Sequence, residues 1–396
     1  MSPAHARLLT STPEVLAAEL AGFGAASGDT PARARASSFA AVRIEGLSSA
    51  ALAALAATVH AEGGELVTAE DRGEALVLGT RAQFAALGQA LRAAGGVEAA
   101  QALDDLFAAL DRPTPPLQLG RYPLPLGRRT LVMGILNMTP DSFSGDGLDF
   151  GVDAAVVRAQ AMQAAGADIL DVGGMSTRPG AEEIAESEEL RRVVPLIERL
   201  AREVDVPLSV DTYRAAVADA ALAAGAVIVN DITGLGAEPE LAGVVTRRGA
   251  ALVLMHIKGT PRTMQDDPQY ADLMGEIIAY LRAGCDRAVA AGVPRDHLWI
   301  DPGIGFGKTI DHNLEILRRL GELRSLGLPV LVGTSRKGFL GRILGGRPPQ
   351  ERVAATGATV AVSIAHGAAI VRVHDVGPAV DVARVADAIL RGRDRS

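Results

Sequence analysis

One alternation constrains the fold of this chain more than any other feature of its sequence. In residues 130–396, a short β-branched run, a polar or glycine-rich loop and a helical stretch such as Asp311–Leu326 follow one another eight times. The expected strands are Thr130–Asn137, Asp168–Val172, Leu208–Asp211, Val227–Asp231, Ala251–His256, Leu298–Asp301, Val330–Gly333 and Ala369–His374. Eight βα units in about 250 residues are typical of a (β/α)8 barrel, whereas an open doubly wound sheet rarely needs eight strands in strict alternation. We therefore predict an α/β fold, a (β/α)8 TIM barrel over residues 130–396.

The sequence before the barrel follows a different pattern. Residues 1–38 mix Ala with Ser, Thr, Pro and Arg, and we expect a helix near Pro13–Phe23 followed by a poorly ordered stretch. Residues 39–111 predict a small α+β domain, with strands at 41–44, 65–68 and 75–79 and helices at 48–62, 81–94 and 97–110. Pro113, Pro115 and Pro116 then break the chain, so residues 112–129 are interpreted as a linker and barrel entry. No motif assigns a function to the N-terminal domain.

Charge and composition argue against several kinds of partner. The net charge is −8, whereas nucleic-acid binding usually requires a basic face. No run of about 18 apolar residues lacks charge, so no membrane span is expected, and the first residues lack the apolar core of a signal peptide. Cys285 is the one cysteine, so no disulfide can form within the chain. We expect a cytoplasmic protein that binds neither nucleic acid nor membrane.

Polar and charged residues follow the expected strands at the point where each strand ends. These ends form the active-site face of a barrel. The segments are Asn137–Ser144, Gly173–Gly180, Asp211–Thr212, Asn230–Asp231, Met255–His256, Asp301–Lys308, Gly333–Lys337 and Arg372–Asp375. Any one of them could be a helix cap, but Asp, Asn, Lys and Arg converging on one ring indicate a site that matches a polar ligand.

Three familiar motifs do not account for this ring. Residues 302–309 end like a phosphate-binding P-loop, but the pattern begins with Pro302 instead of Gly. No G-x-G-x-x-G follows a strand. His256 and His374 stand singly on different strands, whereas a metal-hydrolase barrel would require paired His ligands.

Lys337 stands out among these residues because it directly precedes an expected helix, Gly338–Leu344. The N-terminus of a helix carries partial positive charge and repels a cation. Because Lys337 stands there beside Arg336, we expect an electron-rich ligand that offsets the repulsion between these positive charges. We expect the side chain of Arg336 to point away from that ligand.

Seven motifs, taken in order, resemble the dihydropteroate synthase family. They are NMTPDSFS (137–144), GGMSTRPG (173–180), VDT (210–212), ND (230–231), DPGIGFGK (301–308), SRK (335–337) and RVHD (372–375), and they span essentially all of residues 130–392. The resemblance implies an enzyme that condenses 6-hydroxymethyl-7,8-dihydropterin diphosphate with p-aminobenzoate to 7,8-dihydropteroate and diphosphate. It also implies Mg²⁺, a homodimer packed through barrel helices, and a target of sulfonamides.

The same resemblance implies which residues bind the pterin. Asp211, Asn230 and Asp301 match the residues that read its polar edge, since carboxylates accept from amino and ring N–H groups while Asn both donates and accepts. Lys337 supplies a cation near the pterin carbonyl. The ring is walled and stacked by Met255, Phe306 and Arg372.

The other substrate groups are matched to a second set of residues. The resemblance assigns the diphosphate to Arg372, His374 and Arg178, and Mg²⁺ to Asn137. It places Thr177, Pro179 and Ser335 against p-aminobenzoate. Diphosphate leaves first in this family, so the expected catalytic residues Lys337, Asp211 and Arg372 stabilise charge and position the arylamine for attack.

One residue departs from the family pattern, and it leaves two alternatives open. Met175 stands where the family often has Glu in GGESTRPG, which removes a polar contact and which we interpret as tuning of the site. A pterin-dependent methyltransferase would also bind a pterin in a barrel, but it would not need the NMTPDSFS and SRK loops. A non-catalytic pterin-binding protein is the other alternative.

Overall fold

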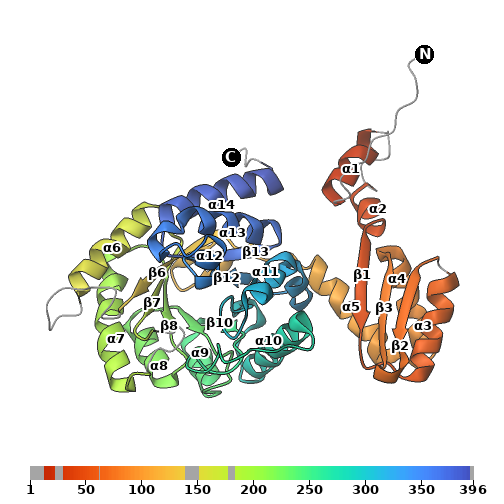
Figure 1. Ribbon diagram of the computed structural model, residues 1–396, viewed down its shortest axis with the longest axis horizontal. Coiled ribbons are helices and arrows are strands. Elements are labelled where there is room, and N and C mark those ends of the chain that lie inside the picture. The colour runs from red at the N-terminus through yellow and green to blue at the C-terminus, as the bar shows by residue number, and fades with distance from the viewer. Residues whose placement is uncertain (1–12, 23–29, 62, 139–150, 177–182, 393–396) are drawn as a thin grey trace, which may run out of the picture. The chain divides into compact units, whose positions relative to one another are not determined.

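The computed structural model describes residues 13–22, 30–61, 63–138, 151–176 and 183–392, which form two compact units, 1–111 and 112–396 (Figure 1). Each unit has its own buried apolar cluster.

The second unit is a closed barrel of eight parallel strands, in the order β10-β11-β12-β13-β6-β7-β8-β9. The strands are β6 (Leu131–Asn137), β7 (Ile169–Gly173), β8 (Leu208–Asp211), β9 (Ile228–Asp231), β10 (Ala251–Met255), β11 (Leu298–Asp301), β12 (Val330–Val332) and β13 (Ala368–Val373). The predicted (β/α)8 TIM barrel is confirmed. Each strand begins and ends within one residue of its expected bounds.

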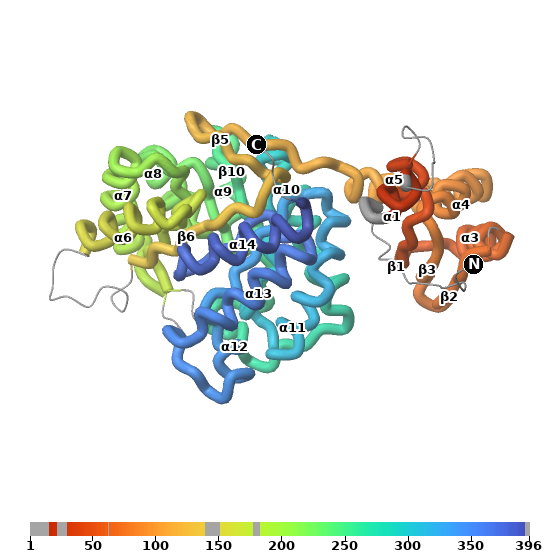
Figure 2. Tube along the Cα trace, turned by 90° about the horizontal axis from the view of Figure 1, so that it is seen from above, coloured from red at the N-terminus to blue at the C-terminus, as the bar shows by residue number. Residues whose placement is uncertain are grey.

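Helices surround the strands, as Figures 1 and 2 show. They are α6 (Val152–Ala164), α7 (Glu186–Glu203), α8 (Ala215–Ala224), α9 (Leu241–Arg248), α10 (Leu273–Ala290), α11 (Ile310–Arg318), α12 (Gly338–Ile343), α13 (Val353–Ala365) and α14 (Val376–Arg391), with 3₁₀ turns η3 (Arg295–His297), η4 (Leu320–Leu326) and η5 (Pro349–Glu351). The single helix expected over Asp311–Leu326 was wrong, because α11 ends at Arg318 and the chain continues as η4. None of the described helices is long and apolar enough to cross a bilayer.

A hairpin closes the N-terminal end of the barrel. It consists of β4 (Leu117–Leu119) and β5 (Tyr122–Leu124), which pair antiparallel across Gly120. Its leucines pack on the residues that begin the barrel strands, including Leu131, Met133 and Ile169. The segment expected as a linker and barrel entry therefore contains the lid of the barrel core.

The first unit is a three-stranded antiparallel sheet with helices packed on it. The strands β1 (Phe39–Ile44), β2 (Glu65–Ala69) and β3 (Glu74–Thr80) lie in the order β1-β3-β2. The helices are α1 (Pro13–Gly22), α2 (Thr30–Ala36), α3 (Ser49–Ala61), α4 (Arg81–Ala93) and α5 (Val97–Asp111), and Glu70–Arg72 form the 3₁₀ turn η1. Helix α2 occupies part of the stretch that was expected to be poorly ordered.

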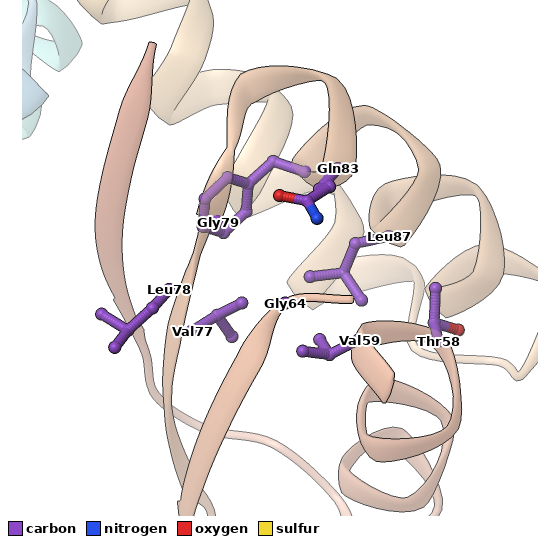
Figure 3. Close-up of a pocket in the computed structure, with 9 residues that line it drawn as sticks. Thr58, Val59, Gly64, Val77, Leu78, Gly79, Gln83 and Leu87 are labelled. Atoms are coloured by element: carbon purple, nitrogen blue, oxygen red, sulfur yellow. The ribbon is translucent and has the colours of Figure 1, made fainter. Parts of the chain in front are cut away.

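The core of this unit is small and aliphatic. Val42, Leu55, Val77 and Leu91 are buried between the sheet and the helices. A small pocket between α3, α4 and the sheet is lined mainly by such side chains, with Gln83 at its edge (Figure 3). That glutamine also completes a capping box with Thr80 at the start of α4, so its role in the structure is the helix cap.

Candidate active site

Strand register brings several of the expected site residues to the C-terminal face of the barrel. Asn137, Gly173, Asp211 and Asn230 stand opposite one another on β6, β7, β8 and β9. Met255 pairs in the same way with Asp301 on β11. Because side chains at these positions face the barrel interior, their polar groups converge above the apolar layer that the hairpin closes.

Arg372 on β13 is the centre of the buried charge network. Its Nε donates to Asp171 Oδ2 at 2.6 Å and its Nη2 donates to Asp211 Oδ2 at 2.7 Å. Asn230 Nδ2 donates to the same Asp171 oxygen at 3.1 Å. Asp171 is fully buried, and its other oxygen, Oδ1, has no hydrogen-bond partner within the described part of the chain.

Asp171 was not among the expected site residues. It lies inside β7, two residues before the strand end, whereas the expected site residues lie at the strand ends. The signal was present, because an ionisable residue interrupts the apolar run Ile169–Gly173 at a position that faces the barrel interior. An unpaired carboxylate there would be costly, so a cationic partner was to be expected.

The carboxylates of Asp211 and Asp301 are held in an environment that favours protonation. The pKa of Asp211 is raised to about 7, chiefly by burial; Arg372 opposes this rise, and the nearby Asp171 contributes to it. Burial also raises the pKa of Asp301, while Lys337 and the N–H of Gly303, which donates to Asp301 Oδ1 at 2.7 Å, lower it. An N–H donor of a ligand would favour the ionised form of each acid, which accepts hydrogen bonds, so ligand binding and ionisation of these carboxyl groups are coupled.

Lys337 lies between the buried charged groups and the ring of Phe306. Its Nζ donates to the carbonyl of Ile304 and lies 4.8 Å from the centroid of the Phe306 ring. Burial lowers the pKa of Lys337 to about 8, and Arg372 acts in the same direction, while Asp301 and Asp211 oppose it. Lys337, Asp211, Asp301 and Arg372 therefore act on one another within one small volume.

The side chain of Arg336 points away from the group formed by Lys337, Asp211, Asp301 and Arg372. Its Nε donates to Asp375 Oδ2 at 2.9 Å in an ion pair at the end of β13. Its backbone is left-handed, with φ of 58°, which turns successive side chains to different sides. The expected difference in orientation between Arg336 and Lys337 is therefore present in the structure.

An apolar cluster borders the charged groups. Met255 is buried in a small cluster with Ile232, Ile257 and Met264, against which Phe306 and Tyr213 pack. Such a surface fits the face of a planar ring. Gln265 donates to the carbonyl of Gly305 at 2.9 Å, which ties the loop after β10 to the loop after β11.

Lys308 binds the main chain of Phe306, which packs against this apolar cluster. It is buried, and its Nζ lies 2.9 Å from both the carbonyl of Phe306 and the Nδ1 of His256. Burial lowers the pKa of Lys308 well below its usual value and that of His256 to about 2. A hydrogen-bonded pair with little charge therefore fixes Phe306 in place.

His374 and Ser335 form a second pair at the mouth of the barrel. The backbone N–H of His374 donates to Ser335 Oγ at 3.1 Å, and the ring Nδ1 lies 3.0 Å from the same oxygen. Burial, together with Arg372 and Arg336, lowers the pKa of His374 to about 3. His374 is therefore neutral in the site without ligand, and its ring can donate an N–H to an anion.

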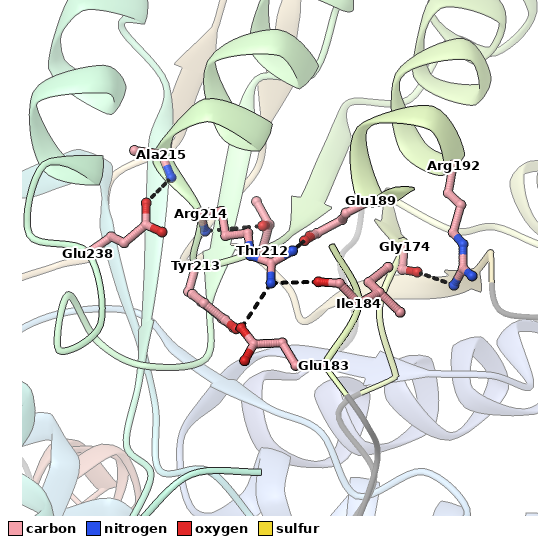
Figure 4. A network of polar contacts seen from close by, with 10 residues as sticks. All are labelled: Gly174, Glu183, Ile184, Glu189, Arg192, Thr212, Tyr213, Arg214, Ala215 and Glu238. Carbon is pink, nitrogen blue, oxygen red and sulfur yellow. Dashed lines mark hydrogen bonds and ion pairs between the residues drawn. The ribbon is translucent and has the colours of Figure 1, made fainter. Parts of the chain in front are cut away.

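Thr177, Arg178 and Pro179, and the NMTPDSFS residues after Met138, lie outside the described residues. Two arginines hold the described residues on either side of 177–182, as Figure 4 shows. Arg192 Nη1 donates to the carbonyl of Gly174 at 3.0 Å. Arg214 donates to the carbonyl of Ile184 at 2.8 Å and to the buried Glu189 at 2.9 Å.

The residues around Asn137 fit a magnesium ion that arrives with a substrate. Among the described residues there is no group of three or more His, Cys, Asp or Glu side chains that could hold a metal. A Cβ on Gly173 would lie 3.3 Å from Asn137 Oδ1, so the absence of a side chain at Gly173 leaves room beside this oxygen. Mg²⁺ is often held by one or two protein oxygens together with phosphate and water.

The fold and this arrangement of groups define a pterin-binding barrel enzyme. A family model described as "Pterin binding enzyme" matches residues 133–374. A dihydropteroate synthase of Synechocystis is 49% identical over 289 residues, which cover 73% of this chain and 100% of that protein. The enzyme of Mycobacterium leprae is 48% identical, over 65% of this chain and 93% of that protein.

Solved structures agree. Yersinia pestis dihydropteroate synthase in a sulfonamide complex is 45% identical with a TM-score of 0.66, over 69% of this chain and 98% of that one. The Xanthomonas albilineans enzyme in complex with 7,8-dihydropteroate is 40% identical with a TM-score of 0.63, over the same shares of the two chains. The chain belongs to the dihydropteroate synthase family, and it is an enzyme, a transferase, as its sequence motifs predicted.

Proposed function

We propose that the site binds 6-hydroxymethyl-7,8-dihydropterin diphosphate by its pterin edge and joins p-aminobenzoate to it, giving 7,8-dihydropteroate and diphosphate. The observation that carries the proposal is the convergence of Asp211, Asn230 and Asp301 with Lys337 beside the Met255 wall. The Xanthomonas albilineans enzyme was solved with 4-aminobenzoic acid and with 7,8-dihydropteroate. The direct test is formation of dihydropteroate and diphosphate by the purified chain; a folded chain that forms no dihydropteroate from the two substrates would contradict the proposal.

The chemistry follows from charge placement more than from proton transfer. When the C–O bond breaks, its electron pair leaves with the diphosphate, and the dihydropterin ring delocalises the positive charge on the methylene carbon. The arylamine nitrogen then forms the new C–N bond and loses a proton to water. Arg372 offsets the negative charge of the departing anion, Lys337 binds the carbonyl oxygen of the pterin, and Asp211 holds the amino edge, so these three residues act at the reacting groups.

The diphosphate would be bound by Arg372, Arg178 and the neutral N–H of His374, with Asn137 as a ligand of Mg²⁺. When bound, the ion would screen the charge of the diphosphate. Chelation of Mg²⁺ is expected to weaken binding of the pterin diphosphate about tenfold or more, while binding of the pterin without diphosphate stays unchanged. Calorimetry with both ligands checks this, and equal losses for both would place the ion elsewhere.

Ser335, Thr177 and Pro179 are proposed to contact p-aminobenzoate. Ser335 is supported by its place at the mouth, where its hydroxyl faces His374. The other two are assigned only by their match to the family motif. If Ser335 has this role, Ser335→Ala should raise the KM for p-aminobenzoate and leave the KM for the pterin unchanged.

The pterin edge can be tested by neutralising its acceptors. Asp301→Asn and Asp211→Asn are each expected to weaken pterin binding by about 1–3 kcal/mol, since an N–H donor of the ring loses its charged acceptor. Calorimetric titration with a pterin measures this. The matched control is Asp219→Asn on α8, which removes a partly exposed ion pair with Arg248. This variant should bind the pterin like the parent. Unchanged affinity in both site variants would remove these residues from the edge-binding role.

We also propose that residues 112–396 are an independent catalytic unit that dimerises through its outer helices. Val385, Ile389 and Leu390 on α14 and Val362 on α13 are exposed apolar residues, and the two helices pack side by side. Exposed apolar side chains on two neighbouring helices are a candidate protein interface. We also propose that the protein lies in the cytoplasm. Its one cysteine, Cys285, is a buried free thiol, which suits a reducing compartment, and cell fractionation would test this.

A truncated chain that begins at Leu117 is expected to fold, catalyse and sediment as a dimer, because every described site residue and the hairpin are retained. A chain that begins at Arg128 is the control. It loses the buried leucines of the hairpin, each worth about 1.5–3 kcal/mol, and should be unstable. A folded but inactive Leu117 chain would show that the first unit contributes to catalysis, and a monomer would refute the proposed dimer surface.

A further inference from the structure

The turn that presents Lys337 has an unusual backbone. Arg336 is left-handed, with φ of 58°, a conformation that a residue with a side chain adopts only where its surroundings hold it. The next residue, Lys337, returns to extended backbone and caps α12. The direction of the Lys337 side chain therefore depends on whatever fixes this turn.

The start of α13 supplies the contacts that hold the turn. Arg352 Nη1 donates to the carbonyl of Arg336 at 2.8 Å and to that of Lys337 at 3.2 Å. The N–H of Arg336 donates to Thr356 Oγ1 at 3.1 Å, one turn further along the same helix. Both peptide groups that flank the left-handed residue are thus bound from one side.

Arg352 is itself held from two directions. Its Nε donates to the carbonyl of Arg347 at 2.7 Å. On the opposite side lies Gly341 of α12, where an added Cβ would stand 2.5 Å from Arg352 Cζ and 2.6 Å from Nε. Only a residue without a side chain leaves this space, so the guanidinium lies flat against the backbone of α12.

We propose that Arg352 is a positioning residue for the dihydropteroate synthase reaction: seated against Gly341, it fixes the Arg336–Lys337 turn so that the Lys337 ammonium faces the pterin. Lys337 faces charged groups from several elements, namely Asp211 on β8, Asp301 at the end of β11, Lys308 in the loop after β11, and Arg372 on β13. Because Arg352 bonds only the main chain of the turn, it acts through Lys337 and does not touch substrate. The inference rests on the proposed role of Lys337.

The test compares Arg352→Met, Arg352→Lys and Gly341→Ala with the parent enzyme. Each variant is expected to lower kcat/KM for the pterin diphosphate about tenfold or more. Lysine is not a conservative replacement here, because a single ammonium lacks the fork that binds two carbonyls at fixed geometry. Gly341→Ala should reproduce the loss while Arg352 itself is still present, because the new Cβ displaces its flexible guanidinium. Gly243→Ala is the matched control, since its Cβ would meet Arg247 at an ordinary 3.4 Å on helix α9.

The pH profile separates positioning from loss of fold. In the parent, kcat/KM should fall as pH rises through about 8, where Lys337 loses its proton. When Arg352 no longer holds the turn and Lys337 reaches solvent, this limb should move toward about pH 10.4, the value of a free lysine. A variant that merely unfolds loses activity at every pH without moving the limb.

The outcomes distinguish the inference from the role on which it rests. If the Arg352 and Gly341 variants lose stability but keep kcat/KM per folded molecule and the parent pH limb, Arg352 is structural only and the inference is overturned. If Lys337→Ala itself has no effect, the proposed role of Lys337 fails first. A loss in Lys337→Ala with unchanged Arg352 variants would overturn the positioning role alone.

Discussion

Arg372→Met is expected to remove about 3–5 kcal/mol of unfolding free energy, because it leaves two carboxylates without their cation inside the barrel. The Asp171 side chain is 0% exposed and that of Asp211 is 9% exposed, and both bind the guanidinium. Methionine fills a similar volume, so the loss reports the missing charge more than a cavity. Chemical denaturation measures it. Arg319→Met, which breaks exposed pairs with Glu315 and Glu322, should cost less than about 1 kcal/mol.

The deficit should depend on pH in a defined direction. Burial raises the pKa of Asp211 to about 7, and Arg372 limits that rise, so the variant should have a still higher value. An acid whose pKa is higher in the folded state destabilises the fold increasingly as pH rises from its unfolded pKa to its folded pKa. The difference from the parent should therefore be larger at pH 8 than at pH 5. A constant deficit would mean that packing dominates.

Activity and stability should separate in a double variant. Asp171→Asn in the Arg372→Met background removes one unpaired charge and should recover part of the stability. It should not restore kcat/KM, which we expect to fall by about 10³-fold when the cation that faces the departing anion is lost. Recovery of activity together with stability would show that Arg372 is needed only for folding.

The barrel strands were predictable from the sequence because each is a short apolar run with a polar residue at its end. Val330–Val332 and Leu298–Asp301 have no competing interpretation. The hairpin was not predictable in this way. Its strands have three residues each, and Pro123 lies in the second, so their stability comes from packing on Leu131 and Met133, which local sequence does not reveal.

The same limit explains which parts of the site were missed. Residues at strand ends, such as Asp211 and Asp301, could be found because barrel topology fixes where strand ends meet. Asp171 carried a local signal, an ionisable residue inside an apolar strand, but its partner Arg372 is 201 positions away in the chain, so the ion pair itself was not predictable. The hold of Arg352 on the Lys337 turn depends on a backbone angle and on a glycine in another helix, neither of which has a sequence signature.

Lys337→Ala is expected to lower kcat/KM by at least about 10²-fold, the order of one lost charged contact in the transition state. The ammonium lies beside Asp301 and over the Phe306 ring, so a pterin on that wall would meet it directly. The same substitution should abolish the fall of kcat/KM near pH 8, because the titrating group is gone. Steady-state kinetics across pH 6–10 measures both effects.

The neighbouring residue provides the control. Arg336→Gly removes a cation one position away but relaxes a left-handed backbone that glycine adopts freely, so the turn itself should persist. Its ion pair with Asp375 is partly exposed, and we expect kcat/KM to stay within about tenfold of the parent, or about 1.4 kcal/mol. Should Arg336 prove essential and Lys337 dispensable, the cation that serves the pterin would be the one now paired with Asp375, and the loop after β12 would have to turn over when substrate binds.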